Sequence, residues 1–136
     1  MSFDFSGYAD AWGRHDHDGV AAHFTADGTY EDTTLAKLME GTDAIAGFVR
    51  DAELSFSSDF TFTVAGAVGS DEGYFMEWVM AGTHDRSGTL PATGKPYAIR
   101  GVSVGTFEGG LIKANRDYWN ALALMAEVGL LPAPGA

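Results

Sequence analysis

The stretch YAIRGVSVGTFEGGLIKANRDYW, from Tyr97 to Trp119, decides the fold class of this chain. It contains two runs rich in β-branched and aromatic residues, Tyr97–Phe107 and Leu111–Trp119. The sequence Glu108-Gly109-Gly110 separates these runs, and glycines in such a place are typical of a hairpin turn. The stretch therefore predicts two long antiparallel strands.

Two further strands are predicted upstream of this hairpin. In Asp59–Ala67, Phe60, Phe62 and Val64 alternate with smaller or polar residues, which is the two-residue period of a strand. Gly73–Thr83 is apolar on both faces except for one glutamate, and a loop with glycines and prolines joins it to the hairpin. We therefore expect four long antiparallel strands in the second half of the chain.

The first half of the chain has the periodicity of helices. Residues 4–14 place four apolar side chains on one helical stripe. A short second helix is expected to carry Val20 and Phe24 after a cap at Asp18. A third helix is expected to begin with Thr42 as its cap.

Shorter elements complete the predicted plan. A turn at Asp27-Gly28 leads into a short strand at Thr29–Thr33, and Asn120 is expected to cap a closing helix. Helices that gather at one end of the sequence are expected to pack on one face of the sheet. The sequence therefore predicts a single α+β domain over residues 1–136.

Composition limits the classes of partner. The chain has 136 residues, 19 of them acidic and 8 basic, and a formal net charge of −11. Such a surface repels phosphates, so neither nucleic acid nor an anionic membrane is an expected partner. There are no cysteines, which excludes disulfides and thiolate chemistry. The N-terminus lacks the pattern of a signal peptide and no apolar run has the length of a membrane span, so a cytoplasmic location is expected.

The last strand provides the first candidate for catalysis. Alternation along that strand places four side chains on one face: Lys113, Asn115, Asp117 and Trp119. If this face lines a cavity, Asp117 is a desolvated acid, and desolvation raises the pKa of a carboxyl towards the range useful for proton transfer. The alternative is a surface carboxylate that pairs with Arg100 or Arg116.

Three other residues are candidates, and each has a structural alternative. Asp32 ends the short strand, where it can act as a base or cap a loop. Tyr8 lies on the apolar stripe of the first helix, and its hydroxyl can donate to a substrate or to a backbone carbonyl. His84 follows a strand and can reach the mouth of a pocket or serve as a loop histidine with satisfied hydrogen bonds.

No metal or organic cofactor is expected. The run His15-Asp16-His17-Asp18 has metal-ligand residue types, but neighbouring side chains diverge in a turn. No glycine-rich phosphate loop leads from a strand into a helix. We expect a largely apolar pocket for a small hydrophobic molecule instead. Its predicted substrate-binding residues are Trp12, Tyr30, Phe48, Met76, Trp78, Met80, Asn115 and Trp119.

Five short segments, in this order and spacing, carry a resemblance to a known family. They are Phe24–Asp32, Gly82–His84, Pro91–Lys95, Arg116–Trp119 and Val128–Pro132. They resemble the SnoaL-like polyketide cyclases of the nuclear-transport-factor-2-like superfamily. The resemblance implies a cone-shaped α+β barrel, with a strongly curved, mostly antiparallel sheet and three N-terminal helices on its concave face. It also implies a homodimer formed through the outer face of the sheet, which bears Arg100, Val102 and Val104.

The same resemblance implies roles for two residues of the last strands. In SnoaL-like cyclases an aspartate of the last strand is the acid/base for an intramolecular aldol closure, and Asp117 resembles it. Limonene epoxide hydrolases have a similar Arg-Asp-Tyr segment, but Trp78 and Met80 stand where those enzymes use an arginine and an aspartate. Ser103 stands where ketosteroid isomerases carry a protonated acid that donates to the substrate oxygen.

Ketosteroid isomerases suggest two more assignments. Their general base lies in a segment that Glu31-Asp32 resembles, and their helix-one tyrosine falls on Tyr8. The leading expectation is therefore acid–base chemistry without a cofactor, of the cyclase or isomerase type, on a polyketide- or terpenoid-like molecule. Asp117 carries the proton, Asp32 assists, and Tyr8, Ser103 and His84 are candidate donors to a developing oxygen charge. The alternatives are water addition to an epoxide or alkene, and a non-catalytic module that binds a hydrophobic ligand.

Overall fold

The structure is a computed structural model that describes residues 3–132. Over this range the helices are α1 (Phe5–Gly13), α2 (His17–Ala21), α3 (Thr42–Ser55) and α4 (Ala121–Glu127). The strands are β1 (Phe24–Asp32), β2 (Lys37–Glu40), β3 (Thr61–Gly69), β4 (Gly73–Thr83), β5 (Pro96–Glu108) and β6 (Leu111–Trp119). Within residues 3–132, no helix is long and apolar enough to cross a membrane.

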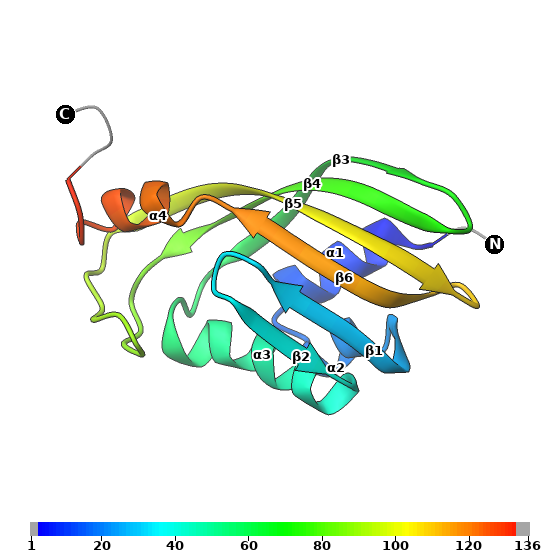
Figure 1. Ribbon diagram of the computed structural model, residues 1–136. Coiled ribbons are helices and arrows are strands. Elements are labelled where there is room, and N and C mark those ends of the chain that lie inside the picture. Colours follow the sequence, from blue (N-terminus) through cyan, green and yellow to red (C-terminus); the bar gives the residue numbers. More distant parts are fainter. Residues whose placement is uncertain (1–2, 133–136) are drawn as a thin grey trace.

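The strands form one mixed sheet in the order β2-β1-β6-β5-β4-β3. The four long strands β3 to β6 pair antiparallel, as predicted, and only β1 and β6 run parallel. Figure 1 shows α1, α2 and α3 together on one side of this sheet, with α4 beyond the end of β6. The α+β class and the helical layer are therefore confirmed.

The expected closed and strongly curved cone is wrong. Closure of a sheet requires its two edge strands to pair with each other. Here β2 and β3 lie at opposite edges of the sheet and do not pair. The sheet is open and is not strongly curled (Figure 1). It provides one broad face that the helices cover.

The start of α2 differs from the prediction. Asp16, not Asp18, is its cap, because the Asp16 carboxylate accepts the backbone N–H of Gly19 at 3.0 Å. Asp18 lies within the first turn of this helix. Phe24 was expected in the helix but is the first residue of β1. Its ring is buried in the core, and an apolar side chain at this position would be expected to be buried in a helix or in a strand.

The start of α3 also differs. Gly41 is the cap residue, with a φ of 87° that favours glycine, and no side chain caps this helix. Thr42, the predicted cap, is already the first helical residue. The cap predicted for the closing helix is confirmed, because the Asn120 side chain accepts the N–H of Ala123 at 3.0 Å.

β1 is longer than predicted and irregular. Phe24 pairs with Ile112 and Thr29 with Ala114, so β1 has a register shift at the place where a turn at Asp27-Gly28 was expected. β2, which pairs antiparallel with β1, was not predicted from the sequence. Its four residues are too few to show a period, and most of them are exposed.

A bulge in β6 corrects the predicted alternation. Thr106 pairs with Ala114 and Phe107 with Ile112, which leaves Lys113 as the extra residue. Ile112 is therefore fully buried, while the Lys113 ammonium forms an ion pair with Asp27 at 2.7 Å. Lys113 was expected to share a face with Asp117, and that part of the prediction is wrong.

Candidate active site

Three adjacent strands bring the polar candidates side by side. Asp32 on β1 is the register partner of Asp117 on β6, and Asp117 is the partner of Ser103 on β5. Tyr30 and Asn115 form the neighbouring pair. Residues that are directly opposite in a ladder share a face of the sheet. All five are buried, so this polar group lies on the covered face.

Asp117 is at the centre of this group and is only 4% exposed. Its Oδ1 accepts the Ser103 hydroxyl at 2.5 Å and the Asn115 amide at 2.9 Å. Its Oδ2 accepts the Tyr30 hydroxyl. Among residues 3–132, no basic side chain forms an ion pair with it. The surface pair with an arginine is therefore not formed, and Arg116 instead contacts the hydroxyl of Tyr118.

The surroundings of Asp117 favour its protonated form. Burial raises its pKa to about 6, and the nearby charge of Asp32 acts in the same direction. The hydrogen bonds from Ser103, Tyr30 and Asn115 stabilise the carboxylate and oppose this rise. A carboxyl whose pKa lies this close to neutrality can both accept and return a proton.

Two further side chains form hydrogen bonds with Ser103 and Asn115, which are two of the three donors to Asp117. The Trp78 indole N–H donates to the Ser103 hydroxyl at 2.9 Å. The Tyr74 hydroxyl donates to the carbonyl oxygen of the Asn115 side chain. Trp78 and Tyr74 both lie on β4, so β4 orients one side chain on β5 and another on β6. Tyr74 was not among the predicted site residues.

Two glycines of β5 make room for these rings. A Cβ at Gly101 would lie 2.2 Å from the Trp78 ring, and a Cβ at Gly105 would lie 2.4 Å from the Tyr74 ring. Glycine on each side of Ser103 therefore lets the rings cross β5. The letters of Gly101–Gly105 also match the Gly-x-Ser-x-Gly pattern of hydrolase elbows, but the segment lies within a continuous strand and forms no elbow.

Aromatic rings from α1 and β3 cover the polar group. The Trp12 ring stacks on Phe62 with centroids 5.6 Å apart, and Phe62 stacks on Trp78 at 5.2 Å. Tyr8 is fully buried next to this stack, where burial and the charge of Asp117 raise the pKa of its hydroxyl. The nearby Trp12 side chain opposes this rise, although the Trp12 N–H forms no hydrogen bond with Tyr8 or with another described residue.

Asp32 has partners of its own. Its carboxylate accepts the Trp119 indole N–H, at 3.0 and 3.2 Å from the two oxygens, and the backbone N–H of Leu35 at 2.9 Å. These bonds hold the turn after β1 against the end of β6. Asp32 is close enough to Asp117 to influence its pKa, but no direct hydrogen bond joins the two carboxyls within residues 3–132.

His84 is not brought to Asp117. It is fully buried in the loop after β4, where its two ring nitrogens contact the carbonyl oxygens of Phe56 at 2.9 Å and Pro91 at 2.8 Å. Its ring stacks on Phe56 at 4.4 Å. These contacts tie the end of α3 to the loop that precedes β5.

The remaining predicted wall residues lie around the same group. Phe48 of α3 packs on Tyr30 with centroids 5.2 Å apart. Met76 is buried and is the register partner of Ser103, and Met80 is partly buried against the core. In residues 3–132, no three His, Asp or Glu side chains gather as ligands for a metal ion.

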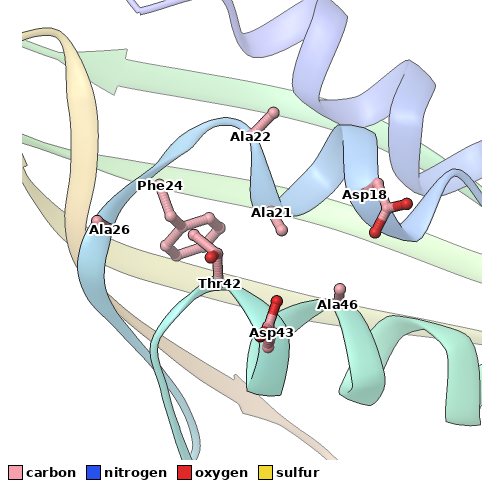
Figure 2. A pocket seen from close by; sticks show the side chains of 8 residues that line it. All are labelled: Asp18, Ala21, Ala22, Phe24, Ala26, Thr42, Asp43 and Ala46. Carbon is pink, nitrogen blue, oxygen red and sulfur yellow. The ribbon is translucent and has the colours of Figure 1, made fainter.

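Two pockets of the structure lie away from Asp117. One, of about 390 Å³, lies between α2, the start of β1 and α3, where four alanines, Asp18, Phe24, Thr42 and Asp43 line it (Figure 2). The other, of about 290 Å³, lies by the hairpin turn at Gly109 and Gly110. Neither pocket contains a predicted catalytic residue.

Comparisons with known proteins agree with this architecture. The family described as the SnoaL-like domain matches residues 5–115. None of the curated proteins matches the chain at a significant level.

Similar solved structures share the fold at low sequence identity. One is a hypothetical protein with a ketosteroid isomerase-like fold from Catenulispora acidiphila, crystallised with trimethylamine. It is 22% identical with a TM-score of 0.82, and the match covers 93% of this chain and 92% of that one. Another, provisionally named a polyketide cyclase, is from Xanthomonas campestris pv. campestris. It is 21% identical with a TM-score of 0.76, over 91% of this chain and 93% of that one. A phenazine biosynthesis-related protein from Pseudomonas aeruginosa is 20% identical with a TM-score of 0.71, and the match covers 89% of this chain and 79% of that one.

Proposed function

The chain belongs to the SnoaL-like domain family, and from this premise we propose that it catalyses proton transfer on a hydrophobic, oxygen-containing small molecule. Asp117 is the acid/base of a reaction of the cyclase or isomerase type. The observation that carries this proposal is the burial of Asp117 among three neutral donors, with its pKa raised to about 6. The provisional name of the Xanthomonas neighbour, polyketide cyclase, fits the same chemistry.

The hydrogen bonds of Asp117 indicate which oxygen reacts. A carboxylate has about four acceptor positions, two on each oxygen. Ser103 and Asn115 occupy both positions of Oδ1, whereas Tyr30 occupies one position of Oδ2. The position that remains is therefore on Oδ2. We assign proton transfer to this oxygen.

The proposed step is the removal of a proton from carbon next to a carbonyl group. Oδ2 of Asp117 takes the proton, the C–H electron pair forms a C=C bond, and the carbonyl electrons move to oxygen. In a β,γ-unsaturated ketone the dienolate can take the proton back from Asp117 at its γ-carbon, which moves the double bond into conjugation and gives isomerisation. In a diketone the enolate carbon can attack the second carbonyl carbon, and the oxygen of that carbonyl takes the proton from Asp117, which gives ring closure. Tyr8, buried beside Asp117, is positioned to donate to the oxygen that gains charge. No step of this scheme requires a cofactor.

The test uses a small ketone that has the required chemistry. 2-Tetralone is apolar and aromatic, and it has exchangeable protons next to its carbonyl. We expect the protein to accelerate deuterium incorporation at these positions above the buffer rate. Asp117→Asn should lower the accelerated rate by about 10²–10⁴-fold, the usual contribution of a general base. Asp27→Asn, at an exposed ion pair, is the matched control. Equal rates in wild type and Asp117→Asn contradict the proposal.

A second function, the non-catalytic binding of a hydrophobic ligand, requires its own test. The stacked rings of Trp12, Phe62 and Trp78 offer an apolar surface, and a module that only binds a hydrophobic ligand needs no reactive carboxyl. Binding of 2-tetralone without acceleration of exchange favours this function. Water addition by an Asp32/Asp117 pair is less well supported, since the Trp119 and Leu35 N–H groups already occupy Asp32.

We also propose that two copies associate through the outer face of the sheet. This face exposes Phe75 (64%), Val102 (38%) and Tyr118 (46%), which lie on three adjacent strands. Val102 is the register partner of Tyr118, and Phe75 is the partner of Val104, which lies two residues after Val102 on the same face of β5. Sedimentation velocity should give a dimer for the wild type and a monomer for Phe75→Glu. A wild-type monomer at high concentration contradicts this assignment.

A further inference from the structure

Two buried polar side-chain atoms of the described residues have no hydrogen-bond partner. They are the indole nitrogen of Trp12 and the hydroxyl of Tyr97. Buried donors in folded proteins are almost always paired, so each exception needs an explanation. A phenylalanine would fill most of the volume of the Trp12 ring without burying an unpaired N–H. An unpaired donor of this kind is therefore available to a partner that is not part of the chain, where its surroundings can hold one.

The two atoms lie in different surroundings. Tyr97 packs on Phe56 near the start of β5, in the region of His84 and away from Asp117. Burial raises its pKa to about 12, and the Ser57 hydroxyl opposes that rise. Nothing in this region is reactive in the proposed scheme, so Tyr97 is a suitable control position.

Trp12 lies within the proposed active site. It is 4% exposed, and its ring packs on Tyr30, whose hydroxyl donates to Asp117. It stands one helical turn after Tyr8, and its side chain lies close enough to the Tyr8 hydroxyl to affect the pKa of that group. The hydroxyl of Tyr8 in turn experiences the charge of Asp117. The unpaired donor and the reactive carboxyl therefore belong to one buried cluster.

We propose that the Trp12 indole N–H binds the carbonyl oxygen of the substrate. This inference rests on the proposed function and narrows its substrate to an apolar ketone, or a related carbonyl compound, that carries a proton on the adjacent carbon. Asp117 takes that proton through Oδ2 while the Trp12 N–H holds the oxygen that receives the electron pair. A hydrocarbon of the same shape leaves the N–H unpaired, so the site discriminates against it.

The first measurement uses the wild-type protein alone. The chain has three tryptophans and therefore three indole N–H signals in a nitrogen-15 NMR spectrum. The N–H groups of Trp78 and Trp119 are already bonded to Ser103 and Asp32, whereas that of Trp12 is free. Titration with 2-tetralone should move the Trp12 signal downfield, and tetralin, the matching hydrocarbon, should not. Absence of a Trp12 shift up to the solubility limit of the ketone overturns the inference.

The second measurement compares variants. Trp12→Phe should weaken 2-tetralone binding about fivefold to tenfold, the loss of one neutral hydrogen bond, and leave tetralin binding unchanged. Tyr97→Phe removes the other unpaired polar atom and should change neither affinity. An equal loss for ketone and hydrocarbon, or no loss at all, contradicts a hydrogen bond from Trp12.

The two proposals can fail separately. If Asp117→Asn abolishes exchange but the ketone does not shift the Trp12 signal, the acid/base assignment stands and the Trp12 inference fails. If the Trp12 signal shifts but Asp117→Asn exchanges deuterium as fast as the wild type, Trp12 binds ketones and the proposed catalysis fails.

Discussion

The hydroxyl of Ser103 lies 2.5 Å from Oδ1 of Asp117 and donates its only proton to that oxygen. The Trp78 N–H, which donates to the same hydroxyl at 2.9 Å, fixes its direction. In this arrangement Ser103 has no proton left for a substrate oxygen. Its effect on chemistry is exerted through Asp117, whose charged form it stabilises. Ser103 is therefore a positioning residue rather than a donor to the substrate.

Ser103→Ala should raise the pKa of Asp117 above its value of about 6, because a donor to the carboxylate is lost. Carbon-13 NMR of the aspartate side-chain carboxyls, recorded against pH, measures this directly. The variant should also lose about 1–3 kcal/mol of stability, since the Trp78 N–H is left without an acceptor.

Ser58→Ala provides the control for this change. Ser58 donates to Asp85 at 2.5 Å, also a serine–aspartate bond, but on the surface. It should leave the titration of Asp117 unchanged. A Ser103→Ala titration that coincides with that of the wild type would show that Ser103 does not tune the carboxyl.

Gly101→Ala should destabilise the protein by about 1–3 kcal/mol, the usual cost of overpacking. The new Cβ would lie 2.2 Å from the Trp78 ring, so the ring must leave Ser103. Urea unfolding measures the change. Gly66→Ala is the control, because nothing lies within 4 Å of a Cβ at that strand position, and it should stay within about 0.5 kcal/mol of the wild type. Equal losses in the two variants would contradict the packing argument.

The pH dependence of stability follows from the raised pKa of Asp117. The unfolded chain titrates this carboxyl near pH 4, whereas the folded protein holds its proton up to about pH 6. Between these values the folded state binds more protons, so the free energy of unfolding falls as pH rises, by up to about 3 kcal/mol. The contribution is fully present below pH 4 and lost above pH 6.

Asp117→Asn isolates this term, because asparagine does not titrate. The unfolding free energy of the wild type minus that of the variant, measured in urea from pH 4 to pH 7.5, should fall as pH rises. A difference that stays constant with pH would mean that Asp117 has an ordinary pKa.

His84→Ala should cost stability rather than chemistry. The imidazole contacts two carbonyl oxygens and stacks on Phe56, so its removal leaves a cavity and unpaired acceptors, for a loss of about 2–4 kcal/mol. The deuterium exchange rate per folded molecule should not change well below the melting temperature. A large fall in that rate at unchanged stability would instead support a catalytic His84.

Local sequence patterns predicted the strands and turns whose formation depends mainly on neighbouring residues. The hairpin of Tyr97–Trp119 follows from two alternating runs around a glycine turn, and the side of β6 that Asp117 occupies follows from the same alternation. The bulge at Lys113 could not be predicted, because it depends on the register with β5. The short strand β2 exists only through its pairing with β1.

In the candidate site, too, local sequence patterns were informative and contacts between distant residues could not be predicted. Asp117 could be selected because a carboxylate between Asn115 and Trp119 suits a covered face better than a solvated one. The contact of Tyr74 with Asn115 joins residues 41 positions apart, and sequence spacing contains no trace of it. The glycines on both sides of Ser103 were a usable signal, since glycine inside a strand often marks the close approach of another group.

The pH profile of deuterium exchange into 2-tetralone, measured side by side in wild type and Asp117→Asn, tests the central assignment most directly. We expect the wild-type rate, corrected for the buffer reaction, to rise as Asp117 ionises, to reach half its maximum near pH 6 and to level off above. The variant should remain at the buffer rate throughout. A wild-type rate that does not change through pH 6, or a variant that follows the wild-type curve, would contradict the role of Asp117 as the base.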